Sequence, residues 1–107
     1  MSGGFFDYDQ YKIGYIADEI EKIIERNGRK KTDEELKEGF FPHNWYIDNP
    51  KDLYFYEYPQ QVIMQFKIAV VMLRQAQVYA HRIDWLLSGD DSEESFIKRL
   101  EKDLKNL

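Results

Sequence analysis

The sequence predicts an all-α fold, an antiparallel three-helix bundle built around one long central helix. Apolar residues recur at helical spacing in three segments, about 8–27, 59–88 and 92–105, and capping signals flank each of them. The middle segment holds four charged residues, whereas its neighbours carry many charges of both signs. A chain of 107 residues is normally one domain, so we expect a single helical domain over residues 1–107.

The first predicted helix, about 8–27, is amphipathic. Asp7 and Gln10 have the spacing of a capping box, which would begin the helix. Asn27 and Gly28 tolerate the left-handed conformation that ends many helices. The apolar face consists of isoleucines at Ile13, Ile16, Ile20 and Ile23. We expect this face to pack on the long helix.

Thr32 and Glu35 repeat the capping-box spacing and predict a short helix over about 33–38. Glu34, Glu35 and Glu38 also match part of the acidic pattern of MazG-like nucleotide pyrophosphohydrolases. In those all-helical enzymes, carboxylates from two helices hold Mg²⁺ beside a triphosphate, and the second acidic pair is not evident in this chain. A nucleotide-binding or nucleotide-cleaving bundle is therefore an alternative, and a solvated helix face is the other interpretation.

An aromatic insertion, about 40–58, lacks helical periodicity, because Pro42 and Pro50 interrupt it. The sequence allows a small hairpin that pairs 45–47 with 53–56, or an irregular loop. Aromatic side chains with polar tips suit interfaces, because they bury area and keep a hydrogen-bonding group. The residues expected to bind a partner are Trp45, Tyr46, Tyr54, Phe55, Tyr56 and Tyr58. The alternative is that they cap the open end of the helical core.

Residues 59–88 predict one helix of roughly 45 Å that is apolar on almost every side. One of its apolar rows consists of Met64, Val71, Val78 and Trp85. The last helix is too short to cover this row, and monomers rarely leave such a row in water. We expect a symmetric homodimer that uses it. The alternative is that the aromatic insertion covers it within one chain.

The last predicted helix, about 92–105, follows Ser88 and Gly89, which end the long one. The candidates for its N-cap are Asp90, Asp91 and Ser92. Its apolar stripe consists of Ile97, Leu100, Leu104 and Leu107. We expect this stripe to pack on part of the long helix.

His81 and Asp84 lie one helical turn apart in the long helix. Such a pair can orient a proton shuttle, yet no nucleophile is evident beside it, so an ion pair within the helix is the favoured interpretation. Arg82 is expected to bind a carboxylate of an adjacent helix. His43 is the other histidine of the chain, and two histidines so far apart do not predict a metal site. We expect no cofactor.

The composition excludes several classes of function. The net charge of −5 and the pI near 5.0 argue against a general nucleic-acid binder, which needs a basic face. The absence of cysteine excludes disulfides and thiolate chemistry. The start of the chain lacks the pattern of a secretory signal, and no apolar run is long enough to span a bilayer. We therefore expect a soluble cytoplasmic protein.

Two segments carry a further resemblance. They are Ser2-Gly3-Gly4-x-Phe6-Asp7-Tyr8-x-Gln10-Tyr11 and Tyr79-Ala80-x-Arg82-Ile83-Asp84-Trp85-Leu86-x-Ser88-Gly89-Asp90-Asp91. Both resemble a family of short proteins from bacteria and their phages that has no assigned activity. The resemblance implies a small intracellular protein encoded by a mobile element, and it carries over no functional residue.

The function that we predict is binding rather than catalysis. The chain would be a small interaction protein that acts on a host protein, in the manner of a counter-defence factor, through the aromatic insertion. Two alternatives stay open. One is the nucleotide-binding or MazG-like bundle, and the other is a purely structural homo-oligomer.

Overall fold

The computed structural model describes residues 4–39, 41–42 and 44–107, and these ranges contain helices and no strand. The prediction of an all-α chain is confirmed. The elements are α1 (Gln10–Arg26), α2 (Asp33–Lys37), α3 (Trp45–Asp48), the 3₁₀ helix η1 (Pro50–Leu53), α4 (Gln60–Leu87) and α5 (Glu93–Lys105). Phe40 and His43 lie outside the described residues, as do Ser2 and Gly3 of the opening motif.

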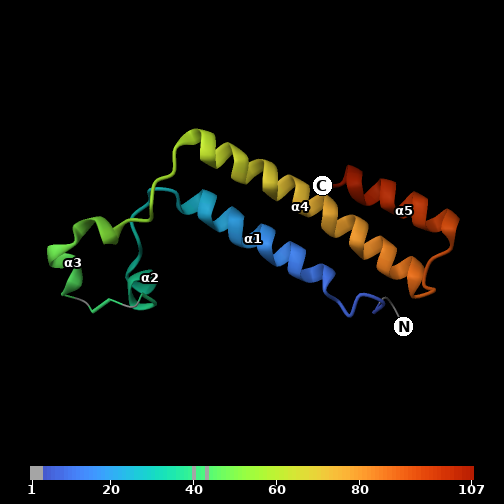
Figure 1. Ribbon diagram of the computed structural model, residues 1–107, viewed down its shortest axis with the longest axis horizontal. Helices are drawn as coiled ribbons and strands as arrows, with labels where there is room; N and C mark the ends of the chain where they lie inside the picture. The colour runs from blue at the N-terminus through green and yellow to red at the C-terminus, as the bar shows by residue number, and fades with distance from the viewer. Residues whose placement is uncertain (1–3, 40, 43) are drawn as a thin grey trace.

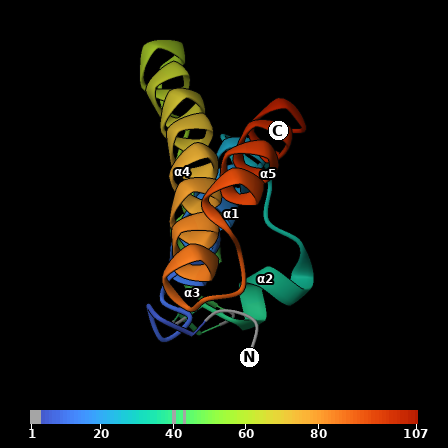
Figure 2. The same ribbon diagram turned by 90° about the vertical axis from the view of Figure 1, so that its right-hand side faces the viewer.

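The long helix α4 carries the other main helices along its length. Helix α1 runs antiparallel beside it, and α5 folds back over its C-terminal half (Figure 1). Seen along the rod, α1 and α5 each pack on α4, while α2 and α3 belong to the far end (Figure 2). The molecule measures 62 × 30 × 15 Å, so in its shortest dimension it is little thicker than one helix.

Small residues bring α1 and α4 close together. Ala17 is fully buried, and Gly14 is buried where a Cβ would lie 2.5 Å from the Gln77 side chain. Arg74 reaches back across this contact and donates to the Gly14 carbonyl and to the Asp18 carboxylate, 3.3 Å and 2.6 Å away. The α1–α4 pair is therefore fixed by close backbone approach and by one bridging guanidinium.

The first helix begins later than its sequence pattern predicts. Asp7 and Tyr8 have positive φ values of 56° and 62°, and α1 begins at Gln10 without a side-chain cap. The predicted capping box at Asp7 is therefore wrong. Its physical cause is that Gln10 is buried, 3% exposed, and that the Asp84 carboxylate holds the Gly4 and Phe6 N–H groups just before it.

The other capping predictions are confirmed. The Thr32 hydroxyl accepts from the Glu35 N–H, and the Glu35 carboxylate accepts from the Thr32 N–H. Ser92, one of the three candidates, caps α5 and exchanges the same pair of bonds with Ser95. Gly89 follows the end of α4 with a φ of 81°, which only glycine adopts easily.

The aromatic insertion forms α3 and η1 rather than a hairpin, so the hairpin alternative is wrong. Trp45 sets the local geometry, because its indole N–H donates to the Asp52 carboxylate 2.7 Å away. This contact between residues seven apart requires a compact turn. Pro50 begins η1, where its missing N–H costs nothing. The nearest approach to strand pairing is an isolated bridge between Lys30 and Tyr54.

Candidate functional site

The aromatic insertion and α2 together form a separate end of the molecule, which we call the head (residues 31–58). It lies beyond the paired ends of α1 and α4 (Figure 1). Backbone bonds tie it to the rod: the Lys31 N–H donates to the Leu53 carbonyl, and the Phe55 N–H donates to the Arg29 carbonyl, at 2.7 Å and 2.8 Å. Two segments, residues 29–31 and 53–55, therefore connect the head to the rod, and we call them the neck.

Asn27 and Gly28 build the base of this neck. The Asn27 side-chain amide accepts from the Tyr58 N–H and donates to the Tyr58 carbonyl. It therefore makes the same pair of bonds that a backbone peptide group of a neighbouring strand would make. Gly28 has a φ of 70°, and a Cβ there would lie 3.1 Å from the Glu57 side chain. The pair that was expected to end α1 thus also aligns the chain that enters α4.

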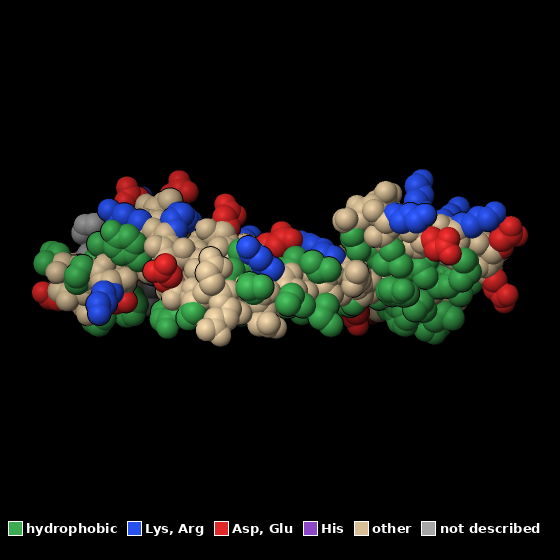
Figure 3. Space-filling model, turned by 90° about the horizontal axis from the view of Figure 1, so that it is seen from above, with side chains coloured by type: hydrophobic (Ala, Val, Ile, Leu, Met, Phe, Trp, Pro, Cys, Tyr) green, Lys and Arg blue, Asp and Glu red, His purple; other side chains and the backbone are tan. Residues whose placement is uncertain are grey.

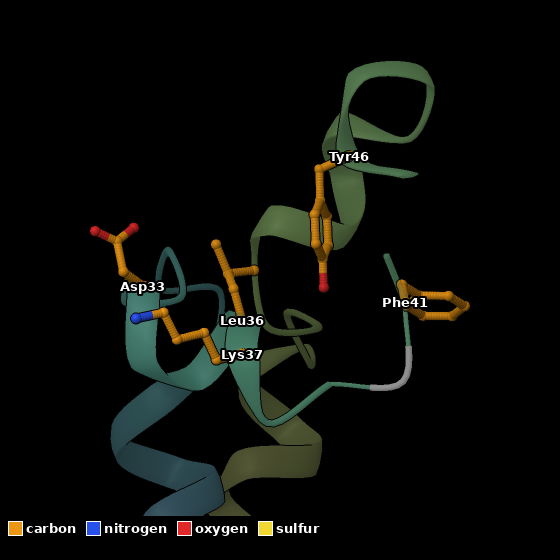
Figure 4. Close-up of a pocket in the computed structure, with 5 residues that line it drawn as sticks. All are labelled: Asp33, Leu36, Lys37, Phe41 and Tyr46. Carbon is orange, nitrogen blue, oxygen red and sulfur yellow. The ribbon is translucent and has the colours of Figure 1, made fainter. Parts of the chain in front are cut away.

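A hollow of about 450 Å³ opens in the head between α2 and α3. Figure 4 shows Tyr46 extending its hydroxyl between Leu36 and Phe41, with Lys37 and Asp33 on the side of α2. Tyr46 is 9% exposed, so it forms the floor, whereas Phe41 is 46% exposed. The volume is within the range of ligand pockets, roughly 300–1,000 Å³, and apolar walls with a few polar groups are typical of them.

An exposed aromatic stack borders this hollow. The rings of Phe41 and Trp45 lie parallel with centroids 4.7 Å apart. Trp45 is 37% exposed, and its indole N–H is already satisfied by Asp52. The stack therefore offers a rigid apolar surface. Binding a partner there does not leave the Trp45 indole N–H without a hydrogen bond, because Asp52 already accepts it.

A cluster of cations surrounds Phe55 on the neck side of the head. Arg26, Arg29 and Lys31 lie 5.2–5.4 Å from the ring centroid. Glu35 of α2 pairs with both arginines, at 3.5 Å and 3.1 Å. The Thr32 backbone N–H, followed by Arg29, lowers the Glu35 pKa to about 2, so Glu35 stays ionised and holds α2 against the neck.

The six residues that were expected to bind a partner fall into two groups. In the first group, Tyr46 lines the hollow, Trp45 stacks on Phe41 at its border, and Tyr54 is 49% exposed beside the neck. Phe55, Tyr56 and Tyr58 turn toward the rod and line a smaller hollow with α1 residues Ile23 and Arg26. Tyr58 packs edge-on against Phe66 of α4, while Tyr56 stays 72% exposed. The structure thus brings these residues to one end of the molecule but not to one face.

The four residues of the predicted dimer row also differ in exposure. Met64 and Val71 are 58% and 56% exposed. Val78 and Trp85 are half-buried, and Val78 lines a small hollow together with Asp103 of α5. The last helix therefore covers the C-terminal part of the row and leaves the N-terminal part open.

The acidic side chains of α2 lie in its first turn, where Glu35 completes the capping box. The Glu35 carboxylate already binds the Thr32 N–H and the Arg29 guanidinium. In the part of the chain that the structure describes, no three acidic or histidine side chains are grouped as metal ligands would be. Glu34 and Glu38 are exposed, as the interpretation of a solvated helix face expects.

Asp84 belongs to a site that the sequence pattern did not reveal. Its carboxylate is fully buried and accepts the backbone N–H groups of Gly4 and Phe6, 3.0 Å and 2.8 Å away. The Phe5 N–H donates to the Ser88 hydroxyl 3.1 Å away. We call this arrangement the N-terminal anchor. These bonds, that of Phe6 first, lower the Asp84 pKa below its usual value of 3.8.

The anchor replaces the ion pair that was predicted between His81 and Asp84. Among the described residues His81 makes no ion pair with Asp84, and its ring lies 6.1 Å from the Tyr11 ring and 5.5 Å from the Trp85 ring. The one available signal was that Asp84 is the sole acidic residue of α4. A carboxylate isolated in an apolar helix requires hydrogen-bond donors, and the chain start supplies them.

Arg82 behaves as its sequence context predicts. It donates to the Asp103 carboxylate of α5 at 2.6 Å and lies 4.0 Å from the Asp91 carboxylate. Arg99 of α5 also binds Asp91. The opening and closing motifs of the sequence therefore hold residues of the N-terminal anchor and of the contact between α4 and α5.

Comparisons with known proteins found no match: no family model, no curated protein and no solved structure is similar to this chain. A membrane-crossing helix, one both long enough and apolar enough, was sought in the described ranges and not found.

Proposed function

We propose that the chain is a non-enzymatic binding module that captures a protein partner with its head. The observation that carries this proposal is the hollow between α2 and α3, with the exposed stack of Phe41 and Trp45 at its border. Large aromatic anchors in and around a preformed pocket are the usual centres of protein interfaces. The predicted three-helix bundle of α1, α4 and α5 serves in this proposal as the scaffold.

The chemistry of the hollow defines the partner. Its apolar walls suit one aliphatic or aromatic side chain of the partner, and Asp33 and Lys37 offer one charge of each sign at the rim. Tyr54 and Tyr56, 49% and 72% exposed, supply a second contact surface beside the neck, separate from the hollow. The partner in this proposal is a protein of the cell in which the chain acts, as the resemblance to phage proteins implies.

The test is capture of proteins from a host lysate by the immobilised full chain. Tyr54→Ala combined with Tyr56→Ala, and Trp45→Ala separately, are expected to weaken capture at least about tenfold, because truncating a hot-spot aromatic costs about 2 kcal/mol or more. The matched control replaces two exposed tyrosines of the rod, Tyr11 and Tyr15, which are 53% and 65% exposed.

The control variant is expected to retain the same captured protein. Circular dichroism has to show unchanged helix content for every variant. Capture that is equal for the wild type and both head variants would contradict the proposal, as would the absence of any captured protein.

A further inference from the structure

The single chain leaves far more surface in water than a folded protein of its mass. Its accessible surface is 8306 Å², whereas a compact monomer of 12.9 kDa exposes about 6,300 Å². Its radius of gyration is 19.6 Å, against about 13 Å for a compact domain of this length. Hydrophobic side chains reach burial at four described positions: Ala17, Tyr46, Ile63 and Val70.

Five of the exposed large hydrophobic side chains lie together on one strip of α4. The strip consists of Met64, Ile68, Val71, Met72 and Tyr79, which are 45–63% exposed. Their spacing places them on one side of the helix, away from α1. Helix α5 does not reach most of this strip, since it packs on the C-terminal half of α4. Figure 3 shows apolar side chains gathered where α5 covers α4 and others continuing along the rod beyond it.

None of the five residues of the strip is charged. Between residues 60 and 81 the charged side chains are Lys67 and Arg74, and Arg74 is taken up by Asp18 and Glu21 of α1. The polar neighbour within the strip is Gln75. In a twofold-symmetric pair the same patch faces itself, with residue i against residue j and j against i, so a patch carrying charges of one sign would repel its copy. An uncharged strip in a chain of net charge −5 therefore suits a second copy.

We propose that two copies of this chain pair through the α4 strip in an antiparallel, twofold-symmetric dimer. The excess surface of about 2,000 Å² per chain amounts to about 4,000 Å² for two chains, which lies within the roughly 2,000–5,000 Å² that permanent homodimers bury over both partners. With the twofold axis between Val71 and Met72, Met64 of one copy lies opposite Tyr79 of the other, and Ile68 lies opposite Gln75. The head of each copy then stands at an opposite end of the pair.

The pairing differs from the row predicted from the sequence. It keeps Met64 and Val71, and it adds Ile68, Met72 and Tyr79 in place of the half-buried Val78 and Trp85. The row was defined by the spacing of residues along α4 alone. The strip is the surface of α4 that α1 and α5 do not cover. Only the arrangement of these neighbours distinguishes the two.

The first test is the mass of the purified full chain in solution, measured by light scattering at micromolar concentration. Twice 12.9 kDa is expected for the wild type, and Ile68→Glu is expected to reduce it to the single-chain mass. The matched control is Ile47→Glu in α3, where the isoleucine is more exposed, 79%, but lies outside the strip. This control is expected to stay dimeric.

A second test does not depend on disrupting the interface. The chain has no cysteine, so a single added cysteine can form only a disulfide between copies. Val71→Cys, next to the axis, is expected to give a cross-linked dimer on mild oxidation, and Lys98→Cys on the exposed side of α5 is not. A single-chain mass for the wild type, a dimer that Ile68→Glu leaves intact, or equal cross-linking of both cysteine variants would overturn the proposal.

Discussion

At the scale of single residues, Asp84 shows how one buried carboxylate organises two distant parts of the chain. It is separated by about eighty positions from Gly4 and Phe6, yet it accepts both of their backbone N–H groups. Burying a carboxylate is unfavourable unless donors surround it. The positive φ angles of Asp7 and Tyr8 are the local consequence, because they turn the chain from the anchor into α1.

Asp84→Asn is expected to destabilise the protein, because the new amide turns a donor toward one of these two backbone donors. The native carboxylate has a lowered pKa, so its stabilising effect is complete above pH 3.8 and is lost as the pH falls through the lower folded pKa. The difference in thermal midpoint between wild type and variant should therefore be constant from pH 7 to pH 5 and shrink below about pH 4.

The same titration series contains its control. Glu35, whose pKa is lowered to about 2, titrates in both proteins and cancels in the difference. A difference that stays constant down to the lowest pH would show that Asp84 is not ionised by the anchor.

At the scale of elements, α4 holds its two neighbours with one arginine each. Arg74 binds Asp18 and Glu21 of α1, and Arg82 binds Asp103 of α5. Arg82 is the better shielded of the two, with its side chain 15% exposed against 27% for Arg74. Charge-assisted bonds shielded from water contribute more than exposed ones.

Arg82→Ala is expected to lower the unfolding free energy by about 2 kcal/mol, because it leaves Asp103 and Asp91 without this partner. Amide hydrogen exchange should become faster in α5 and stay unchanged in α1. Arg74→Ala is the reciprocal control, with faster exchange expected in α1. If amide exchange became faster by the same amount in α1 and α5 in both variants, each arginine would not hold one helix separately.

At the scale of the whole molecule, the chain is a flat rod with a head at one end. The α1–α4 and α4–α5 contacts leave one side of α4 open, so the few buried side chains provide limited hydrophobic stabilisation. The proposed dimer would place a second layer on that side. Folding and association would then be coupled.

This coupling predicts that stability depends on protein concentration. The thermal midpoint is expected to rise between about 1 and about 100 μM, since a hundredfold increase in a binding partner stabilises by about 2.7 kcal/mol. Differential scanning calorimetry across this range provides the measurement. The Ile68→Glu variant should melt at a lower temperature that does not change with concentration, and a wild-type midpoint independent of concentration would contradict the coupling.

Local signals in the sequence were enough to place most helices. The spacing of apolar residues predicted α1, α4 and α5. The capping box at Thr32 correctly marked the start of α2, and Ser92 was one of three N-cap candidates for α5. The start of α1 and the α3–η1 turn were missed for one reason. In both, the outcome depends on a bond that a local pattern does not contain: Asp84 binds the backbone just before α1, and Trp45 bonds Asp52.

The sequence by itself determined that the chain is helical, that α4 is its long apolar helix, and that the region before Pro59 is aromatic, because periodicity and composition are local properties. The tertiary structure alone decided how the aromatic residues divide between the hollow and the neck. It also decided which side of α4 stays open and that Asp84 binds the chain start instead of His81. These outcomes depend on which distant groups meet, and the spacing of residues along one helix does not encode that.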